Sequence, residues 1–225
     1  MAAALTLYRS SIGKKTIMAL TGLIGIGFVL MHMVGNLKVF LGAQAFNDYA
    51  HFLREFGEPV LPYGTVLWLI RLVLLGAVAL HIMAAYQLTR QDWAGRPVRY
   101  ARQKPVQSTF ASRTMRWGGV ILALFIVYHI AHMTLGLVHP NFVHGDAYQN
   151  YVIAFQVWWV TLIYVVAMLA LGLHIYHGFW SLFQTLGLNS RTYNQLLRGL
   201  ALLIAMVVIG GFLAPALAVL FGVVV

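Results

Sequence analysis

Five long stretches of the chain are almost entirely apolar, and short segments rich in Gly, Pro, Asn and Arg separate them. A helix needs about 20 mostly apolar residues to cross about 30 Å of hydrocarbon. All five stretches reach that length, so the pattern predicts an all-α integral membrane bundle of five transmembrane helices, forming one domain over residues 1–225. The predicted spans are residues 16–41, 63–89, 115–138, 152–182 and 196–221.

The segment between the first two spans has a different pattern. Within residues 45–56, aromatic and apolar side chains recur at helical spacing, with polar residues between them. This amphipathic pattern is typical of a helix that lies along a membrane surface. We expect a short helix there, on the outer side of the membrane.

The composition supports the membrane assignment and narrows the chemistry. Hydrophobic residues make up 61% of the chain, charged residues only 9%, and the mean hydropathy is +0.81. These values exclude a soluble globular domain, a disordered chain and a nucleic-acid binder. The chain has no cysteine. Disulfides, iron–sulfur ligation, thiolate ligation of haem and covalent c-type haem are therefore excluded.

The net charge of +10 reflects membrane topology. Twelve of the fifteen Lys and Arg residues lie before the first span, between spans two and three, or between spans four and five. The opposite side carries Lys38, Arg54 and four of the five acidic residues. The positive-inside rule places the N-terminus in the cytoplasm and the C-terminus outside, and we expect a bacterial cytoplasmic membrane. The basic loop, residues 90–116, is either a topology signal alone or also a docking face for a cytoplasmic partner or anionic lipid.

Histidines are the unusual feature of the spans. An ionisable side chain inside a bilayer is costly, so each one is a functional-site hypothesis by default. The predicted spans contain His32, His81, His129, His132, His174 and His177. Four different spans carry at least one of them, which favours a shared function over isolated packing roles.

A weak internal repeat groups four of these histidines. The sequence from Gly22 to His32 matches that from Gly119 to His129, with Gly ten residues and Phe four residues before each His. His81 and His174 each lie between Leu and Ile in the next span. His32, His81, His129 and His174 therefore form one equivalent set.

The depths of these side chains predict two cofactor sites. His32 and His129 lie toward the outer face, and His81 and His174 toward the cytoplasmic face. Depth alone would accept His132 slightly better than His129, but the repeat favours His129. Two facing pairs of imidazoles suit two haems b, each with two axial ligands and no open position. Zinc and copper are less suitable, because their sites usually add thiolates, carboxylates or further histidines at close spacing.

Three more polar residues in the spans have two interpretations each. Arg71 either pairs with a propionate of the outer haem or reaches the interface or a backbone carbonyl. His132 and His177, each one turn beyond a predicted ligand, either contact a propionate or a quinone oxygen or are hydrated residues near the two surfaces.

The segments around these residues resemble a known family. They are SIGKKTIMALTG, LMHMVGNLKVF, AFNDYAHFL, LHIMAAY, RWGGVILALFIVYH and LHIYHGFWSLFQTLGL. Similar segments occur in the cytochrome b membrane-anchor subunit of succinate dehydrogenase and fumarate reductase, in the class with one five-helix anchor and two haems b.

The resemblance implies ligands, partners and a function. His32 and His129 would hold the outer haem, and His81 and His174 the inner haem. The partners would be a flavoprotein subunit, an iron–sulfur subunit docked on the cytoplasmic face, and membrane quinone. The chain would pass electrons between the iron–sulfur subunit and quinone, as part of an enzyme whose succinate chemistry takes place elsewhere.

Two other functions remain open. One is a haem b membrane subunit of another respiratory oxidoreductase, such as a hydrogenase or a formate dehydrogenase. Five spans with one ligand on each of the first four weigh against it. The other is a transporter whose histidines relay protons without haem, and this function predicts a colourless protein.

Overall fold

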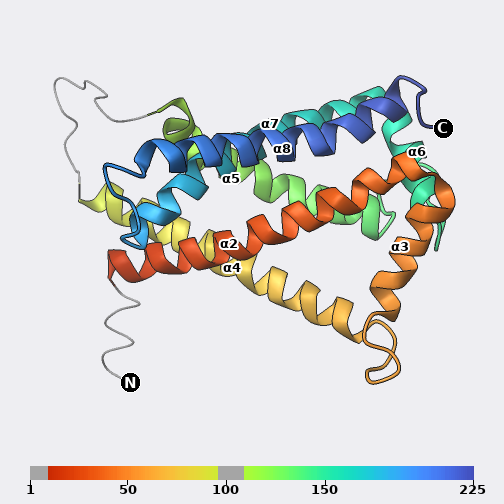
Figure 1. The fold of residues 1–225 in the computed structure, drawn as a ribbon, viewed down its shortest axis with the longest axis horizontal. Coiled ribbons are helices and arrows are strands. Elements are labelled where there is room, and N and C mark those ends of the chain that lie inside the picture. The colour runs from red at the N-terminus through yellow and green to blue at the C-terminus, as the bar shows by residue number, and fades with distance from the viewer. Residues whose placement is uncertain (1–9, 96–108) are drawn as a thin grey trace.

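The computed structural model describes residues 10–95 and 109–225, and within them the protein is all-helical. In chain order the elements are α2 (Ser11–Leu37), η1 (Lys38–Leu41), α3 (Ala43–Glu55), α4 (Thr65–Ala94), α5 (Phe110–His129), the π-helical turn η2 (Ile130–Thr134), α6 (Ala147–Gln156), α7 (Trp158–Thr185) and α8 (Asn194–Leu220). Figure 1 shows the long helices running side by side along the length of the molecule.

Five segments of the described chain are long and apolar enough to cross a membrane, which makes this an integral membrane protein. They are Ser11–Leu41, Thr65–Ala94, Phe110–Thr134, Trp158–Thr185 and Asn194–Leu220. The predicted all-α fold with five spanning helices is confirmed. The basic residues Arg9, Arg96, Arg99, Arg102 and Lys104 lie outside the described residues.

The fourth span differs most from its predicted bounds. It begins at Trp158 and not near residue 152, because Val157 is extended (ψ 108°) and separates α6 from α7. Thr161 stabilises this break by donating to the Phe155 carbonyl at 2.8 Å, a carbonyl that the interrupted helix leaves without its usual partner. At the other end of α6, Asp146 caps the helix by accepting from the backbone N–H of Gln149 at 2.9 Å.

Four other span ends differ from the prediction by four or five residues. The second span continues to Ala94 and not to residue 89, and the third begins at Phe110 and not at residue 115. The first span starts at Ser11 and includes Lys14, because the Ser10 hydroxyl accepts from the Gly13 backbone N–H at 3.0 Å and caps α2. The third span ends in the π-helical turn at Thr134, four residues before the predicted end.

The predicted amphipathic helix is α3, and none of its residues is buried. It lies with α6 at the end of the molecule that carries the C-terminus (Figure 1). Asn47 of α3 joins the two helices, because it donates to the Asp146 carboxylate and accepts from the Tyr148 backbone N–H, both at 3.0 Å. The bonds from Gln149 and Asn47 hold the pKa of Asp146 below its ordinary value.

The long helices pack as pairs that match the internal repeat. Helix α2 packs along α4, α5 packs along α7, and α8 packs against both α7 and α2. Helices α7 and α8 approach closely at Gly172, where a Cβ would overlap the side chain of Ile209. Helices α4 and α5 bury only small side chains, which are Ala77 and Ala84 in α4 and Ala111 in α5. Most large side chains of α4 and α5 therefore face outward, as expected for helices in contact with lipid.

Candidate functional site

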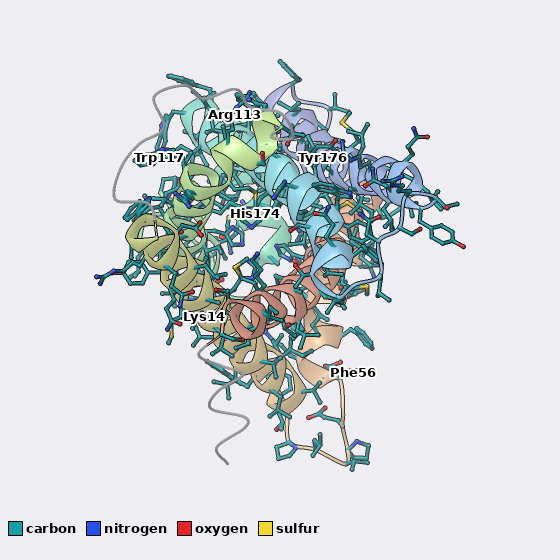
Figure 2. All side chains as sticks on the ribbon, turned by 90° about the vertical axis from the view of Figure 1, so that its left-hand side faces the viewer. Lys14, Phe56, Arg113, Trp117, His174 and Tyr176 are labelled. Atoms are coloured by element: carbon teal, nitrogen blue, oxygen red, sulfur yellow. The ribbon has the colours of Figure 1, made fainter. Side chains whose placement is uncertain are left out.

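Two pairs of histidines face each other inside the bundle. The rings of His32 on α2 and His129 on α5 have centroids 5.8 Å apart. The rings of His81 on α4 and His174 on α7 have centroids 6.0 Å apart. Figure 2, viewed along the bundle, shows His174 toward its centre. The four histidines that the repeat groups together thus come from four different helices and form two pairs.

The two pairs lie at different levels. His32 and His129 line a pocket with Phe46 of α3 and Tyr151 of α6, at the end of the bundle where these short helices lie. His174 lines a second, largely apolar pocket with Phe110 at the start of α5, toward the opposite end. We refer to the first as the outer pair and to the second as the inner pair.

The spacing within each pair fits one metal ion held between two imidazoles. An imidazole nitrogen bonds a transition metal at about 2.0 Å, so two rings on opposite sides of one ion have centroids about 6 Å apart. The observed 5.8 and 6.0 Å agree with this value. Among the described residues, no group of three or more His, Cys, Asp or Glu side chains is placed to hold a metal ion. Each pair instead offers two ligands, the number of axial positions on a haem.

Glycines of the repeat lie beside the inner pair. A Cβ on Gly22 of α2 would lie 3.5 Å from Cε1 of His81, and one on Gly119 of α5 would lie 4.0 Å from Cε1 of His174. A methyl group would just touch either ring, and a longer side chain would cover it. The two glycines are equivalent in the sequence repeat, so the repeat has a counterpart in the geometry of the site.

The Thr21 hydroxyl determines which ring nitrogen of His81 carries the proton. Thr21 Oγ1 lies 3.0 Å from His81 Nδ1 and donates its own proton to the Ile17 carbonyl at 2.7 Å. A hydroxyl has one proton, so Thr21 accepts from His81 Nδ1–H. This tautomer leaves the Nε2 lone pair available for a metal, an arrangement common among metal-bound histidines.

A hydroxyl also contacts the outer pair. The Tyr164 hydroxyl on α7 lies 3.1 Å from Nδ1 of His129 and 3.1 Å from Nδ1 of His132. The sequence did not predict that Tyr164 and Thr21 contact the histidine pairs. The only signal for them was a polar group within an apolar span, and many tyrosines and threonines share that signal.

His132 is not a hydrated surface residue, and that expectation is wrong. Its side chain is completely buried, stacked between Tyr128 at 5.3 Å and His139 at 5.0 Å between ring centroids. The reason is the π-helical turn and the loop after it, which place His139 over His132. The sequence gives no sign of that arrangement.

His177 and Arg71 each contact a tryptophan. His177 is half-buried, with its ring 6.1 Å from that of Trp180, one turn further along α7. The Arg71 guanidinium lies over the Trp68 ring at 4.9 Å, on the same face of α4. These contacts are compatible with each of the interpretations given above for the two residues.

Comparisons of the chain with models of protein families, with curated proteins and with solved structures gave no match.

Proposed function

We propose that this protein is a di-haem cytochrome b that anchors a succinate:quinone oxidoreductase in the membrane. The observation that carries the proposal is the convergence of four histidines, from four helices, into two facing pairs with metal-bridging spacing. The resemblance of the histidine-centred segments to the anchors of succinate dehydrogenase and fumarate reductase supplies the kind of complex.

Each pair has a distinct role in this proposal. His32 and His129 are the axial ligands of an outer haem, and His81 and His174 are those of an inner haem. Haem supplies one-electron redox chemistry. If each pair of imidazoles held a haem iron, no position would be left open for oxygen, and the sites would be suited to electron transfer. This assignment of electron transfer rests on the two histidine pairs and not on the shape of the pockets beside them.

The separation of the two pairs supports electron transfer across the membrane. Gly22 lies beside His81, and His32 follows ten residues later on the same helix. Gly119 and His129 repeat this spacing beside His174. At 1.5 Å per residue the two pairs are about 15 Å apart along the helices, about half the hydrocarbon thickness. Two haems at these levels would carry electrons between a site at the cytoplasmic face and one in the outer half of the bilayer.

The partners follow from the proposed function. An iron–sulfur subunit docks on the cytoplasmic face and receives electrons from a flavoprotein subunit that handles succinate, and His81 and His174 would hold the haem nearest to it. Membrane quinone is the other redox partner. The protein lies in a bacterial cytoplasmic membrane with its N-terminus inside and its C-terminus outside. The chain belongs to the enzyme but does not itself act on succinate.

Reduction of the purified complex by succinate tests this function. The chain would be purified from native membranes in mild detergent through a C-terminal tag. We expect two larger subunits, one with flavin and one with iron–sulfur clusters, to copurify, and succinate to produce the reduced spectrum of a b-type cytochrome. A coloured protein reduced by dithionite but not by succinate would indicate another respiratory enzyme. A colourless protein would favour the proton-relay transporter.

A further inference from the structure

The outer pair is linked to a second histidine through one tyrosine. The Tyr164 hydroxyl is within 3.1 Å of Nδ1 on both His129 and His132. Tyr164 is 7% exposed and His132 has no exposed surface, so water does not compete for these bonds. The rings of Phe125 and Phe155 pack edge-on against Tyr164, at 5.0 and 4.8 Å between centroids, and fix its orientation.

A buried tyrosine hydroxyl needs an acceptor for its one proton, and the two acceptors within reach are the imidazoles of His129 and His132. With that proton donated to one neutral imidazole, the hydroxyl accepts from the other, which leaves two arrangements for these three groups. In the first arrangement, His129 Nδ1–H donates to Tyr164, and Tyr164 donates to His132 Nδ1. In the second, both bonds are reversed, and His129 carries its proton on Nε2. Only the first leaves Nε2 of His129 free to bind iron.

His132 is held in place to accept the proton of Tyr164. Its ring stacks on His139, which accepts from the Asn141 backbone N–H at 3.3 Å and whose Nε2 lies 2.9 Å from the Asn150 carbonyl. The Asn150 side chain makes two 2.7 Å hydrogen bonds to the backbone of Val143 and ties the loop to α6. The fold of the loop and of α6 thus determines the position of His132.

We propose that Tyr164 is a positioning residue for the outer haem, an inference that rests on the proposed function. Its hydroxyl, held by His132, fixes the tautomer of His129 and accepts the Nδ1–H bond. An imidazole that donates this bond is a more basic ligand. A more basic ligand stabilises ferric over ferrous iron, so Tyr164 lowers the potential of the outer haem. Thr21 has the corresponding role at His81 of the inner pair.

Tyr128 provides a matched control. It lies in the same cluster, with its ring 6.2 Å from that of Tyr164 and stacked on His132. Its hydroxyl is buried and has no hydrogen-bond partner among the described residues. Tyr164→Phe and Tyr128→Phe therefore each remove one buried hydroxyl from one cluster, and only the first removes a hydrogen bond to a predicted ligand.

The test is a redox titration of the purified complex, with optical and electron paramagnetic resonance detection of each haem. In Tyr164→Phe we expect both haems to be retained and the outer potential to rise. We expect the ferrous-to-ferric ratio at a given potential to rise by at most about tenfold, which is a shift of about 59 mV for a one-electron couple. The resonance position of the outer haem should also change, and the inner haem should stay the same. Thr21→Val should affect the inner haem alone, and Tyr128→Phe neither.

The proposed role of Tyr164 can fail while the proposed function holds. Unchanged outer potential and resonance in Tyr164→Phe would overturn it and leave the proposed function intact. Equal shifts, or equal loss of haem, in Tyr164→Phe and Tyr128→Phe would also overturn it, because the effect would then come from packing. A wild-type protein without haem would overturn both the inference and the proposed function. A second variant, His132→Phe, keeps an aromatic ring in the stack, and we expect a smaller rise in the outer potential.

Discussion

At the scale of single residues, the choice of ligand depends on which ring nitrogen is free and which ring it faces. His129 faces His32 at 5.8 Å between centroids and has Tyr164 at its Nδ1. His132 instead stacks between two aromatic rings in a closed environment. The side chain that the repeat selects, His129, is thus the one that faces a histidine of another predicted span, whereas His132 stacks on His139 of the following loop.

Substitution of the histidines separates ligands from neighbours. His129→Ala should remove the outer haem and leave the inner spectrum, because the other rings against His32, those of Phe28 and Phe212, cannot bind a metal. His174→Ala should remove the inner haem for the corresponding reason. His132→Ala should keep two haems and shift the outer potential only. Haem content and low-temperature spectra measure these effects. A His132 variant that loses a haem while the His129 variant keeps both would show that the assignment is wrong.

The sequence identifies the histidines better than their partners. The repeat is local in the chain, so His32, His81, His129 and His174 can be recognised as a set without a structure. Thr21 and Tyr164 contact histidines on other helices, and such contacts depend on the rotation and register of each helix. Periodicity within one span contains no information about these quantities. The burial of His132 was missed because it depends on a loop that folds back over it.

At the scale of elements, the five spans follow from the hydrophobic pattern, but their ends follow from single side chains. The break at Val157 contains no Gly or Pro, and the apolar pattern continues through it. At this break Val157 is extended, and Thr161 donates to the Phe155 carbonyl that the interrupted helix leaves without its usual partner. Hydropathy alone cannot distinguish such an interruption from a continuous helix.

The Asp146 cap makes the outer end of the molecule sensitive to pH. The folded-state pKa of Asp146 is lower than the unfolded value, because Gln149 and Asn47 donate to the carboxylate. Its contribution to stability is therefore present above the unfolded pKa and is lost as the pH falls through the folded pKa. Asp146→Ala should lower stability at neutral pH by about 1 kcal/mol, typical of a lost N-cap. Thermal unfolding in detergent should show this difference at pH 7, and the difference should decrease in acid. An equal difference at both pH values would contradict the role of the carboxylate.

At the scale of the whole molecule, two similar halves and one basic side define the architecture. Helices α2 and α4 form one pair of helices, α5 and α7 form the other, and each pair of helices contributes one histidine to the outer pair and one to the inner pair. Basic residues gather on the side opposite to α3 and α6, where Arg116 and Asp92 form a salt bridge at 2.8 Å. We interpret this side as the face that meets the iron–sulfur subunit.

Charge reversal tests this interpretation. Replacement of Arg96, Arg99 and Arg102 by Glu should weaken copurification of the iron–sulfur subunit. The loss should grow with salt concentration, because the remaining attraction is then screened. The fraction of partner retained on the tagged chain, compared at low and high salt, is the readout. Full retention at all salt concentrations would leave the loop as a topology signal only.

The central claim is that each chain holds two haems b between two pairs of histidines. It is tested most directly by the haem content of the purified protein, counted per polypeptide after acid–acetone extraction. We predict two haems per chain, all of them extracted, because the chain has no cysteine to hold haem covalently. A ratio near one or zero, or haem that stays on the polypeptide, would contradict the account.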